Sequence, residues 1–255
     1  MAKPNGAVLW RGPSQIDGKP VLLIVTGLNK SSRNGKTGEL LQTWIIREDI
    51  DPITAANNGE DKSICGSCIH RGKVIDGKNV GRTCYVTLFQ APLNIYKSYH
   101  RGIYGRDLST VQGMHLLRGR KVRMGAYGDP AAIPIHVWEH VLSLTLAVTG
   151  YSHQWRTASP RFALYVMASC DTVQDTIDAQ ALGYRTFRVT ALDAKSDKQA
   201  REVICPASKE MGVKTSCAAC LACGGKGAKA RANIVIQVHG MASKINAYRS
   251  NQLTA

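Results

Sequence analysis

The sequence predicts an α/β fold, a partial (β/α) barrel-like structure with a mainly parallel sheet, an N-terminal antiparallel β cap and cysteine-rich metal-binding loops. From about residue 121 onward, short β-rich runs alternate with helix-length segments, the pattern of parallel strands joined by crossover helices. Before residue 48, β-rich runs are separated only by turn-rich segments, as in antiparallel hairpins. We therefore expect a β-rich cap over residues 1–48 and a barrel-like domain over residues 49–255, or one continuous domain that contains both.

Capping and turn residues place the individual elements. Asp51 and Pro52 are suited to begin a short helix, and Gly102 is suited to end a helix over residues 92–100. Asp171 and Gly183 likewise suit the start and stop of a helix over residues 171–183. A second long helix is expected over residues 131–150, and strands are expected over residues 121–127, 152–155, 161–169, 185–190, 201–207 and 232–240.

Composition narrows the class of protein. Hydrophobic residues make up 44% of the 255 residues, which is enough for a sizeable core. No window approaches the roughly 18 uninterrupted apolar residues of a membrane-spanning helix, so no membrane partner is expected. The first residues lack a charged segment followed by an apolar run, which predicts a cytoplasmic protein rather than a secreted one. In a reducing cytoplasm, the eight cysteines need an explanation other than disulfides.

Seven of the eight cysteines fall into two groups. The first cysteine group is Cys65, Cys68 and Cys84, with the spacing C-x2-C-x15-C, and the second cysteine group is Cys205, Cys217, Cys220 and Cys223, with the spacing C-x11-C-x2-C-x2-C. Both groups lie in segments rich in Gly, Lys and Ser, where a thiol has little core to join, so we predict that they bind metal. Cys170 ends an apolar run and is predicted to be a core or strand-end residue.

The spacings favour iron–sulfur clusters over zinc. Three thiolates at consecutive x2 spacings, as in the second group, suit a 4Fe–4S cluster better than a zinc site, which usually pairs two C-x2-C knuckles. The chain is therefore predicted to hold one or two 4Fe–4S clusters. The first group has only three cysteines, which leaves one iron open to a substrate, to His70 or to Cys170. A zinc site with three cysteines and either His70 or His100 remains the alternative cofactor arrangement.

Positive charge is concentrated in one stretch. Lys and Arg number 33 against 18 Asp and Glu, and residues 97–123 hold seven basic residues against one acidic residue. Tyrosines interleave with these cations, as in surfaces that stack bases while contacting phosphates. The stretch therefore predicts a nucleic-acid or nucleotide partner, with a solvated basic face as the alternative. The predicted nucleic-acid contacts are Lys97, Arg101, Arg118, Arg120, Lys121 and Arg123.

Two further motifs carry weaker predictions. His136, Glu139 and His140 match the H-x-x-E-H pattern of inverted zinc proteases, but the neighbouring apolar residues favour a helix whose histidines lie on the surface. The Gly-rich, basic segment from Gly224 to Arg231 lacks the P-loop pattern and is predicted to be a solvated loop that could contact phosphate.

The cysteine motifs, together with Gly128-Asp129-Pro130, resemble those of a family of bacteriophage- and plasmid-encoded cysteine-rich proteins without an assigned activity. This resemblance implies a phage origin, and hence the cytoplasm of a host cell. A weaker likeness is to radical S-adenosylmethionine enzymes, which are partial barrels with three cysteines in a loop after the first strand. It implies that the first group holds the catalytic cluster, and that the second group holds an auxiliary one.

The likeness to these enzymes also implies that Gly128, Asp129 and Pro130 bind S-adenosylmethionine, with Asp129 as the catalytic-site contact to its amino group. The chain departs from that family because the usual C-x3-C-x2-C motif is absent. The alternative is a non-enzymatic, zinc-binding, nucleic-acid-binding protein.

Overall fold

A computed structural model describes residues 4–31, 34–105 and 108–253. Its strands are β1 (Gly6–Pro13), β2 (Pro20–Thr26), β3 (Leu41–Arg47), β4 (Lys73–Ile75), β5 (Lys78–Val80), β6 (Lys121–Tyr127), β7 (Ala147–Ser152), β8 (Met167–Cys170), β9 (Thr186–Thr190), β10 (Glu202–Ile204) and β11 (Asn233–Gln237). Its α-helices are α1 (Pro52–Asn58), α2 (Lys62–Cys65), α3 (Ala91–His100), α4 (Thr110–Leu116), α5 (Ile135–Leu142), α6 (Val173–Ala181), α7 (Ala194–Asp197), α8 (Cys217–Cys220) and α9 (Ala242–Leu253). Its 3-10 helices are η1 (Ile69–Arg71), η2 (Pro130–Ala132), η3 (Pro160–Leu164), η4 (Lys209–Met211) and η5 (Gly225–Gly227).

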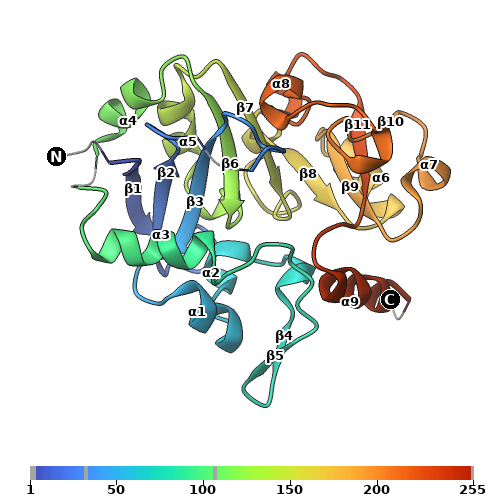
Figure 1. Ribbon diagram of the computed structural model, residues 1–255, viewed down its shortest axis with the longest axis horizontal. Coiled ribbons are helices and arrows are strands. Elements are labelled where there is room, and N and C mark those ends of the chain that lie inside the picture. Colours follow the sequence, from blue (N-terminus) through green and yellow to red (C-terminus); the bar gives the residue numbers. More distant parts are fainter. Residues whose placement is uncertain (1–3, 32–33, 106–107, 254–255) are drawn as a thin grey trace.

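The fold is the predicted mixed α/β class, with one large, mainly parallel sheet. Its strand order is β1-β2-β3-β6-β7-β8-β9-β11-β10, and β4 and β5 form a separate hairpin. In Figure 1 the large sheet crosses the molecule from β1 on the left to β10 on the right, and the β4–β5 hairpin projects below it. The strands β1, β2 and β3 pair antiparallel, whereas every pair from β3 to β10 is parallel.

The antiparallel and parallel parts form one continuous sheet. β3 pairs with β2 on one side and with β6 on the other, so no break in the sheet marks residue 48. From β6 to β9, neighbours in the sequence are also neighbours in the sheet, which is the winding of a (β/α) barrel. Within the described residues β1 and β10 are its two edges, so the sheet is open, as in a partial barrel.

The hydrophobic core packs against the large sheet. In β2 every residue from Val21 to Val25 is fully buried, which is typical of a strand that is covered on both faces. Trp138, on α5, is also fully buried and donates a hydrogen bond from its ring nitrogen to the carbonyl of Pro130 (2.8 Å). This contact fixes α5 beside the turn that follows β6.

Several element predictions are confirmed. Asp51 caps α1, whose first residue is Pro52, and α3 covers the helix expected over residues 92–100. β6 has the predicted bounds. Cys170 is fully buried as the last residue of β8.

Other element predictions are wrong. Residues 131–150 do not form one helix: α5 ends at Leu142, and β7 begins at Ala147 and pairs with β6. The expected strand over residues 152–155 is the end of β7 followed by a turn, and much of the strand expected over residues 161–169 is η3. In each case a continuous apolar run suits either a buried helix or a buried strand, and only pairing with a neighbour decides between them.

The cap of α6 is also corrected. Thr172, and not Asp171, is the N-cap residue, and its hydroxyl accepts a hydrogen bond from the N–H of Asp175 (3.0 Å). The carboxylate of Asp175 accepts in return from the N–H of Thr172, which completes a capping box. Asp171 is therefore available for another role.

Candidate metal centres

The first cysteine group lies at the carboxyl edge of the parallel sheet. Cys65 ends α2, and the residue before it accepts a hydrogen bond at its carbonyl from the N–H of Asp129, just after β6 (2.6 Å). The carbonyl of Cys65 accepts from the side-chain amide of Gln154, just after β7 (3.0 Å). Two neighbouring strands thus hold this loop at the edge where parallel sheets place their functional groups.

The turn between Cys65 and Cys68 requires its glycine. Gly66 has a positive φ of 56°, and a Cβ there would lie 2.3 Å from the Oε1 atom of Gln154. That same oxygen accepts hydrogen bonds from the N–H (3.2 Å) and the hydroxyl (3.1 Å) of Ser67. The close approach of Gln154 sets the path of the loop between two of the thiols.

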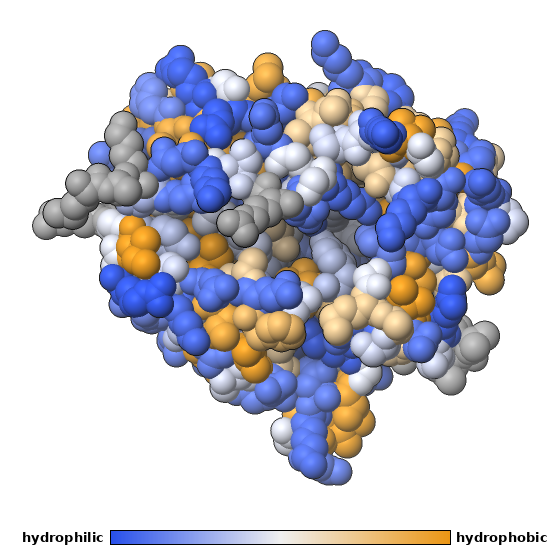
Figure 2. Space-filling view, in the orientation of Figure 1, coloured by the Kyte–Doolittle hydropathy of each residue, from blue (hydrophilic) through white to orange (hydrophobic). Residues whose placement is uncertain are grey.

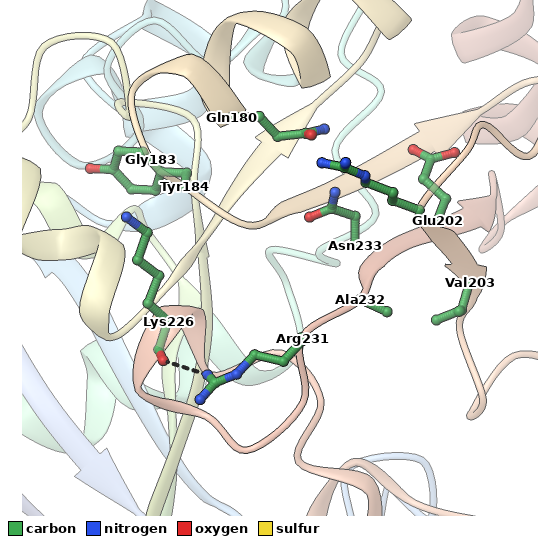
Figure 3. A pocket seen from close by; sticks show the side chains of 10 residues that line it. Gln180, Gly183, Tyr184, Glu202, Val203, Lys226, Arg231, Ala232 and Asn233 are labelled. Atoms are coloured by element: carbon green, nitrogen blue, oxygen red, sulfur yellow. Dashed lines mark hydrogen bonds between the residues drawn. The ribbon is translucent and has the colours of Figure 1, made fainter.

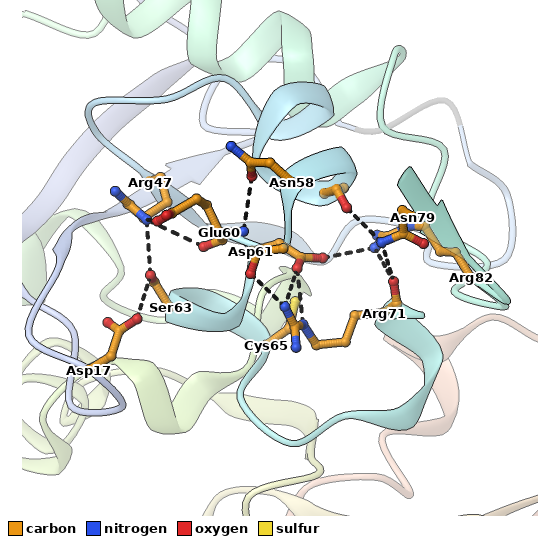
Figure 4. Close-up of polar contacts among 12 residues, drawn as sticks. Asp17, Arg47, Asn58, Glu60, Asp61, Ser63, Cys65, Arg71, Asn79 and Arg82 are labelled. Carbon is orange, nitrogen blue, oxygen red and sulfur yellow. Dashed lines mark hydrogen bonds and ion pairs between the residues drawn. The ribbon is translucent and has the colours of Figure 1, made fainter. Parts of the chain in front are cut away.

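A buried ion-pair network supports the first group from behind (Figure 4). The carboxylate of Asp61 is fully buried and accepts hydrogen bonds from Arg71 (3.0 and 2.7 Å) and from Arg82 (2.8 Å). Since Arg82 lies two residues before Cys84, and Asp61 lies four residues before Cys65, the network joins the two ends of the cysteine loop. The loop is therefore held in place by charge pairing as well as by its thiols.

The thiols of the first group affect one another electrostatically. Burial raises the pKa of Cys65 well above its usual range, and Asp61, Cys68 and Cys84 raise it further. Burial also raises the pKa of Cys84, although Arg82 opposes that shift. The three thiols, which span 19 residues from Cys65 to Cys84, are thus close enough to interact electrostatically.

Two buried polar atoms beside these thiols lack a partner among the described residues. They are the hydroxyl of Tyr127, at the end of β6, and the Nη2 atom of Arg82. Burial raises the pKa of Tyr127 well above its usual range, and the Cys65 thiolate raises it further. A buried donor without an acceptor is costly, so both atoms point to a group that would complete this site.

Two histidines and an aspartate adjoin the first group. His70 Nε2 lies 2.8 Å from Asp171 Oδ1, and His153 Nε2 lies 3.6 Å from Asp171 Oδ2. The other ring nitrogen of His70 contacts the hydroxyl of Thr83 (2.7 Å). Burial lowers the pKa of His153, but Cys68 and Asp171 outweigh burial and raise it well above its usual range. One potential ligand atom from each of these three residues lies within 4.8 Å of the other two.

The second cysteine group lies in the segment between β10 and β11, and its last cysteine contacts β7. Cys205 directly follows β10, and its N–H donates to the carbonyl of Val235 in β11 (2.9 Å). Cys217 and Cys220 bound α8, capped by Ser216. The carbonyl of Cys223 accepts a hydrogen bond from the N–H of Gly150 in β7 (3.0 Å). This bond holds the end of the second group against β7.

Basic and phenolic side chains surround the second group. Burial raises the pKa of Cys223 to about 12, against the effect of the Tyr151 hydroxyl, which donates to its sulfur. Burial also raises the pKa of Cys217, whereas the charges of Arg123 and Lys36 lower it. The positive charges would stabilise thiolates in this group.

Within the described residues, neither group brings three thiols within 4.8 Å of one another. Thiolates that share a tetrahedral zinc ion would be separated by about 3.8 Å, given a zinc–sulfur bond of about 2.3 Å. A 4Fe–4S cube binds each thiolate at a different iron, so it accepts wider separations.

The other predicted ligands, Cys170 and His100, make contacts of their own. Cys170 contacts the carbonyl of Ala168, and burial raises its pKa, which Asp175 and Asp171 raise further. His100 contacts the carbonyl of Glu48 (3.0 Å) and packs against Tyr96. Of the candidates for a fourth position, only His70 lies beside the first group, next to the unpredicted His153.

The Gly128-Asp129-Pro130 turn lies beside the first group, and its carboxylate is largely engaged. Asp129 is 7% exposed and accepts from the N–H of Ala131 (2.9 Å), the hydroxyl of Ser152 (2.7 Å) and the N–H of His153 (2.7 Å). These bonds join the ends of β6 and β7 and hold the backbone of His153. Gly128 has a φ of 81°, and a Cβ there would lie 2.6 Å from the carbonyl of Ile45.

The six predicted nucleic-acid contacts do not share one environment. Lys97, Arg101 and Arg118 are exposed, the first on α3 and the last after α4. By contrast, Lys121 donates to the carbonyl of Ala218 (2.8 Å), and Arg123 donates to the hydroxyl of Tyr85 (2.7 Å). Arg120 lies 3.4 Å from the carbonyl of Gly27, and residues 106 and 107 lie outside the described residues. Lys121 thus contacts the loop of the second cysteine group, whereas Arg123 contacts the residue that follows Cys84 of the first group.

His136 and His140 lie on the exposed side of α5, and Val137, Trp138 and Val141 form its buried side. This confirms that the H-x-x-E-H match lies on a helix surface. Glu139 pairs with Arg161 rather than with a histidine.

His153, Asp171 and Tyr127 are site residues that the sequence alone did not indicate. Each lies at or just after the carboxyl end of a parallel strand, β7, β8 or β6. Correct strand bounds for residues 147–152 and 167–170 would have placed His153 and Asp171 at strand ends.

Comparison of the chain with models of protein families, with curated proteins and with solved structures gives no match. No helix within the described residues has the length and apolar character needed to cross a membrane.

Proposed function

We propose that this chain is an iron–sulfur protein whose first centre keeps one position for an exchangeable ligand. The observation that carries the proposal is the convergence of only three thiols, beside the unpartnered Tyr127 hydroxyl, at the carboxyl edge of a parallel sheet. In Figure 2 the molecular surface is hollowed near the centre of the face, between the regions of α8 and α2. Such a hollow offers room for a substrate.

Chain order supports a radical S-adenosylmethionine-like version of this function. The first cysteine group follows β3, the first strand of the parallel series, and the Gly128-Asp129-Pro130 turn follows β6, the next one. The N–H of Asp129 donates to the backbone of the cysteine loop, so the turn adjoins the centre. In this proposal a cluster on Cys65, Cys68 and Cys84 would supply an electron and an open iron to a bound cosubstrate.

The protein's own residues have defined roles in this proposal. Asp129 positions His153 through the backbone, and Asp61 holds both ends of the cysteine loop through Arg71 and Arg82. The nucleic-acid or nucleotide partner remains a prediction for the exposed Lys97, Arg101 and Arg118.

Anaerobic purification, with absorption spectra and analysis of iron, sulfide and zinc, tests the proposal. We expect iron and sulfide in the wild-type protein, and less of both in Cys68→Ser and in Cys220→Ser. The electron paramagnetic resonance spectrum of the reduced protein should change with S-adenosylmethionine, and this change should be absent in Cys68→Ser. A colourless protein with stoichiometric zinc and no iron would refute the cluster.

The alternative is a zinc-binding protein that binds nucleic acid without catalysis. It is favoured by one observation: His70, His153 and Asp171 bring ligand atoms within 4.8 Å of one another, which suits a single ion. The two candidates differ in their response to His70→Ala. That substitution should remove zinc if the alternative holds, and should leave most of the iron in place if the cluster proposal holds.

A further inference from the structure

A cavity opens on the edge of the sheet opposite to the first cysteine group. It lies at the amino ends of β9, β10 and β11, where Tyr184, Glu202 and Asn233 line it (Figure 3). It is a shallow site, widely open to solvent, with a volume of about 630 Å³. No cysteine or histidine of the proposed metal centres lines it, although Lys226 and Arg231 lie in the segment that carries the second cysteine group.

Three basic side chains line this cavity without an acidic partner. Arg201, Lys226 and Arg231 come from separate positions in the chain, and none lies within 4.0 Å of a carboxylate in the described residues. The one carboxylate in the lining, Glu202, is 3% exposed and receives two hydrogen bonds from Arg188 (2.9 and 2.7 Å). Its charge is therefore balanced within the protein rather than by the cavity cations.

A buried arginine, Arg185, holds the segment that carries Lys226 and Arg231, because its guanidinium donates to the carbonyls of Gly225 (3.0 Å) and Ala232. Arg185 is 7% exposed, and its Nε atom is buried without a hydrogen-bond partner among the described residues.

The rest of the lining provides neutral donors and an apolar wall. The Oδ1 atom of Asn233 accepts from the N–H of Thr186 (3.0 Å), which leaves its amide N–H groups to donate. Gly183 has a φ of 82°, and a Cβ there would lie 2.6 Å from the Nζ atom of Lys226, so glycine admits the lysine. Val203, which is 41% exposed, supplies apolar surface beside the cations.

We propose that this cavity binds a phosphorylated small molecule of nucleotide size, with its phosphates held by Arg201, Lys226 and Arg231 and its apolar part against Val203. Basic side chains and amide donors around a concave site are the groups that recognise phosphate. This function is distinct from the proposed iron–sulfur function, and it gives a role to the Gly-rich segment from Gly224 to Arg231.

Isothermal titration calorimetry of the full-length protein with ATP, AMP and inorganic phosphate tests the proposal. We expect saturable binding of ATP with a stoichiometry of one, and about tenfold weaker binding in each of Lys226→Gln and Arg231→Gln, since each substitution removes one charged contact. Val203→Glu, at an exposed position, should weaken binding similarly without disturbing the core. Lys78→Gln, an exposed charge change in the β4–β5 hairpin, is the matched control and should bind as wild type.

A competition experiment distinguishes a small nucleotide from nucleic acid as the source of the bound phosphate. If a single-stranded oligonucleotide competes with ATP and loses affinity in Lys226→Gln, the cavity binds the phosphates of nucleic acid, which still supports the site. Absence of saturable binding of all these probes would overturn the proposal, as would equal weakening by Lys78→Gln. Iron and sulfide content, measured on the same samples, reports on the cluster proposal separately.

Discussion

The two cysteine groups differ in how the surrounding protein holds them. The loop of the first group is fixed by side-chain ion pairs, centred on the buried Asp61, and by Gln154. The second group lies in the segment between β10 and β11, where basic side chains donate to loop carbonyls: Lys121 to Ala218, and Arg185 to Gly225. One site is held by charge pairing within its own loop, and the other by cations that reach it from the sheet.

This difference indicates different roles. A loop that its own ion pairs hold in place can leave a metal position open without losing its shape. The segment of the second group has only the short elements η4, α8 and η5, so a bound metal would contribute more to its order. We therefore expect the first centre to be reactive and the second to be structural or electron-transferring.

The largest expected effect compares one thiol from each group. Cys220→Ser should lower the free energy of unfolding by about 5 kcal/mol or more, because a structural metal site contributes directly to folding. Cys68→Ser should cost much less, because the Asp61 network remains. Thermal unfolding of the anaerobic proteins measures both, and equal losses of Tm would contradict the assigned roles.

The next effect tests the ion pairs of the first loop. Asp61→Asn removes a buried charge from Arg71 and Arg82, and breaking such a pair typically costs about 3–5 kcal/mol. Glu60→Gln is the neighbouring control, since Glu60 is 44% exposed and its pair with Arg47 is worth less. Denaturant unfolding compares the two variants. If Asp61→Asn lowers the free energy of unfolding only slightly, the metal, and not the ion-pair network, holds this loop.

Two residues at the end of β7 separate the centres spectroscopically. His153 contacts the Cys68 thiol, whereas Tyr151, two residues earlier, donates to Cys223. We expect His153→Ala to change only the electron paramagnetic resonance signal of the first centre, and Tyr151→Phe to change only that of the second. Tyr151→Phe should also lower the free energy of unfolding by about 1 kcal/mol, because it removes one hydrogen bond. If either substitution altered both signals, the two centres would not be independent.

The smallest effect is a pH dependence at the base of the first loop. The hydrogen bond from the Arg47 guanidinium lowers the pKa of Asp49 below its usual value of 3.8. Its carboxylate therefore stabilises the folded state above that pH, and this contribution is lost as pH falls through the folded-state pKa. Because Asp49 is half exposed, Asp49→Asn should cost only a few tenths of a kcal/mol at pH 7, and this cost should shrink as pH falls below 3.8. A difference in stability that stays constant as pH falls from 7 into the acid range would rule out this cause.

Much of the fold followed from local sequence. Asp51 and Pro52 predicted the start of α1, and the alternation of β-rich and helical segments predicted a mainly parallel sheet. The prediction failed where an apolar run was continuous, as in residues 131–150, because hydrophobicity alone does not distinguish a buried strand from a buried helix.

The sequence by itself determined the division of the cysteines into a three, a four and the buried Cys170, because C-x2-C spacing places thiols together through a short stretch of chain. Only the tertiary structure decided which histidine faces the first group, and that Asp61, Tyr127 and Asp171 adjoin it. These residues meet because the carboxyl ends of parallel strands, far apart in sequence, converge at one edge of the sheet. Strand pairing and burial, and not residue spacing, therefore set the surroundings of both groups.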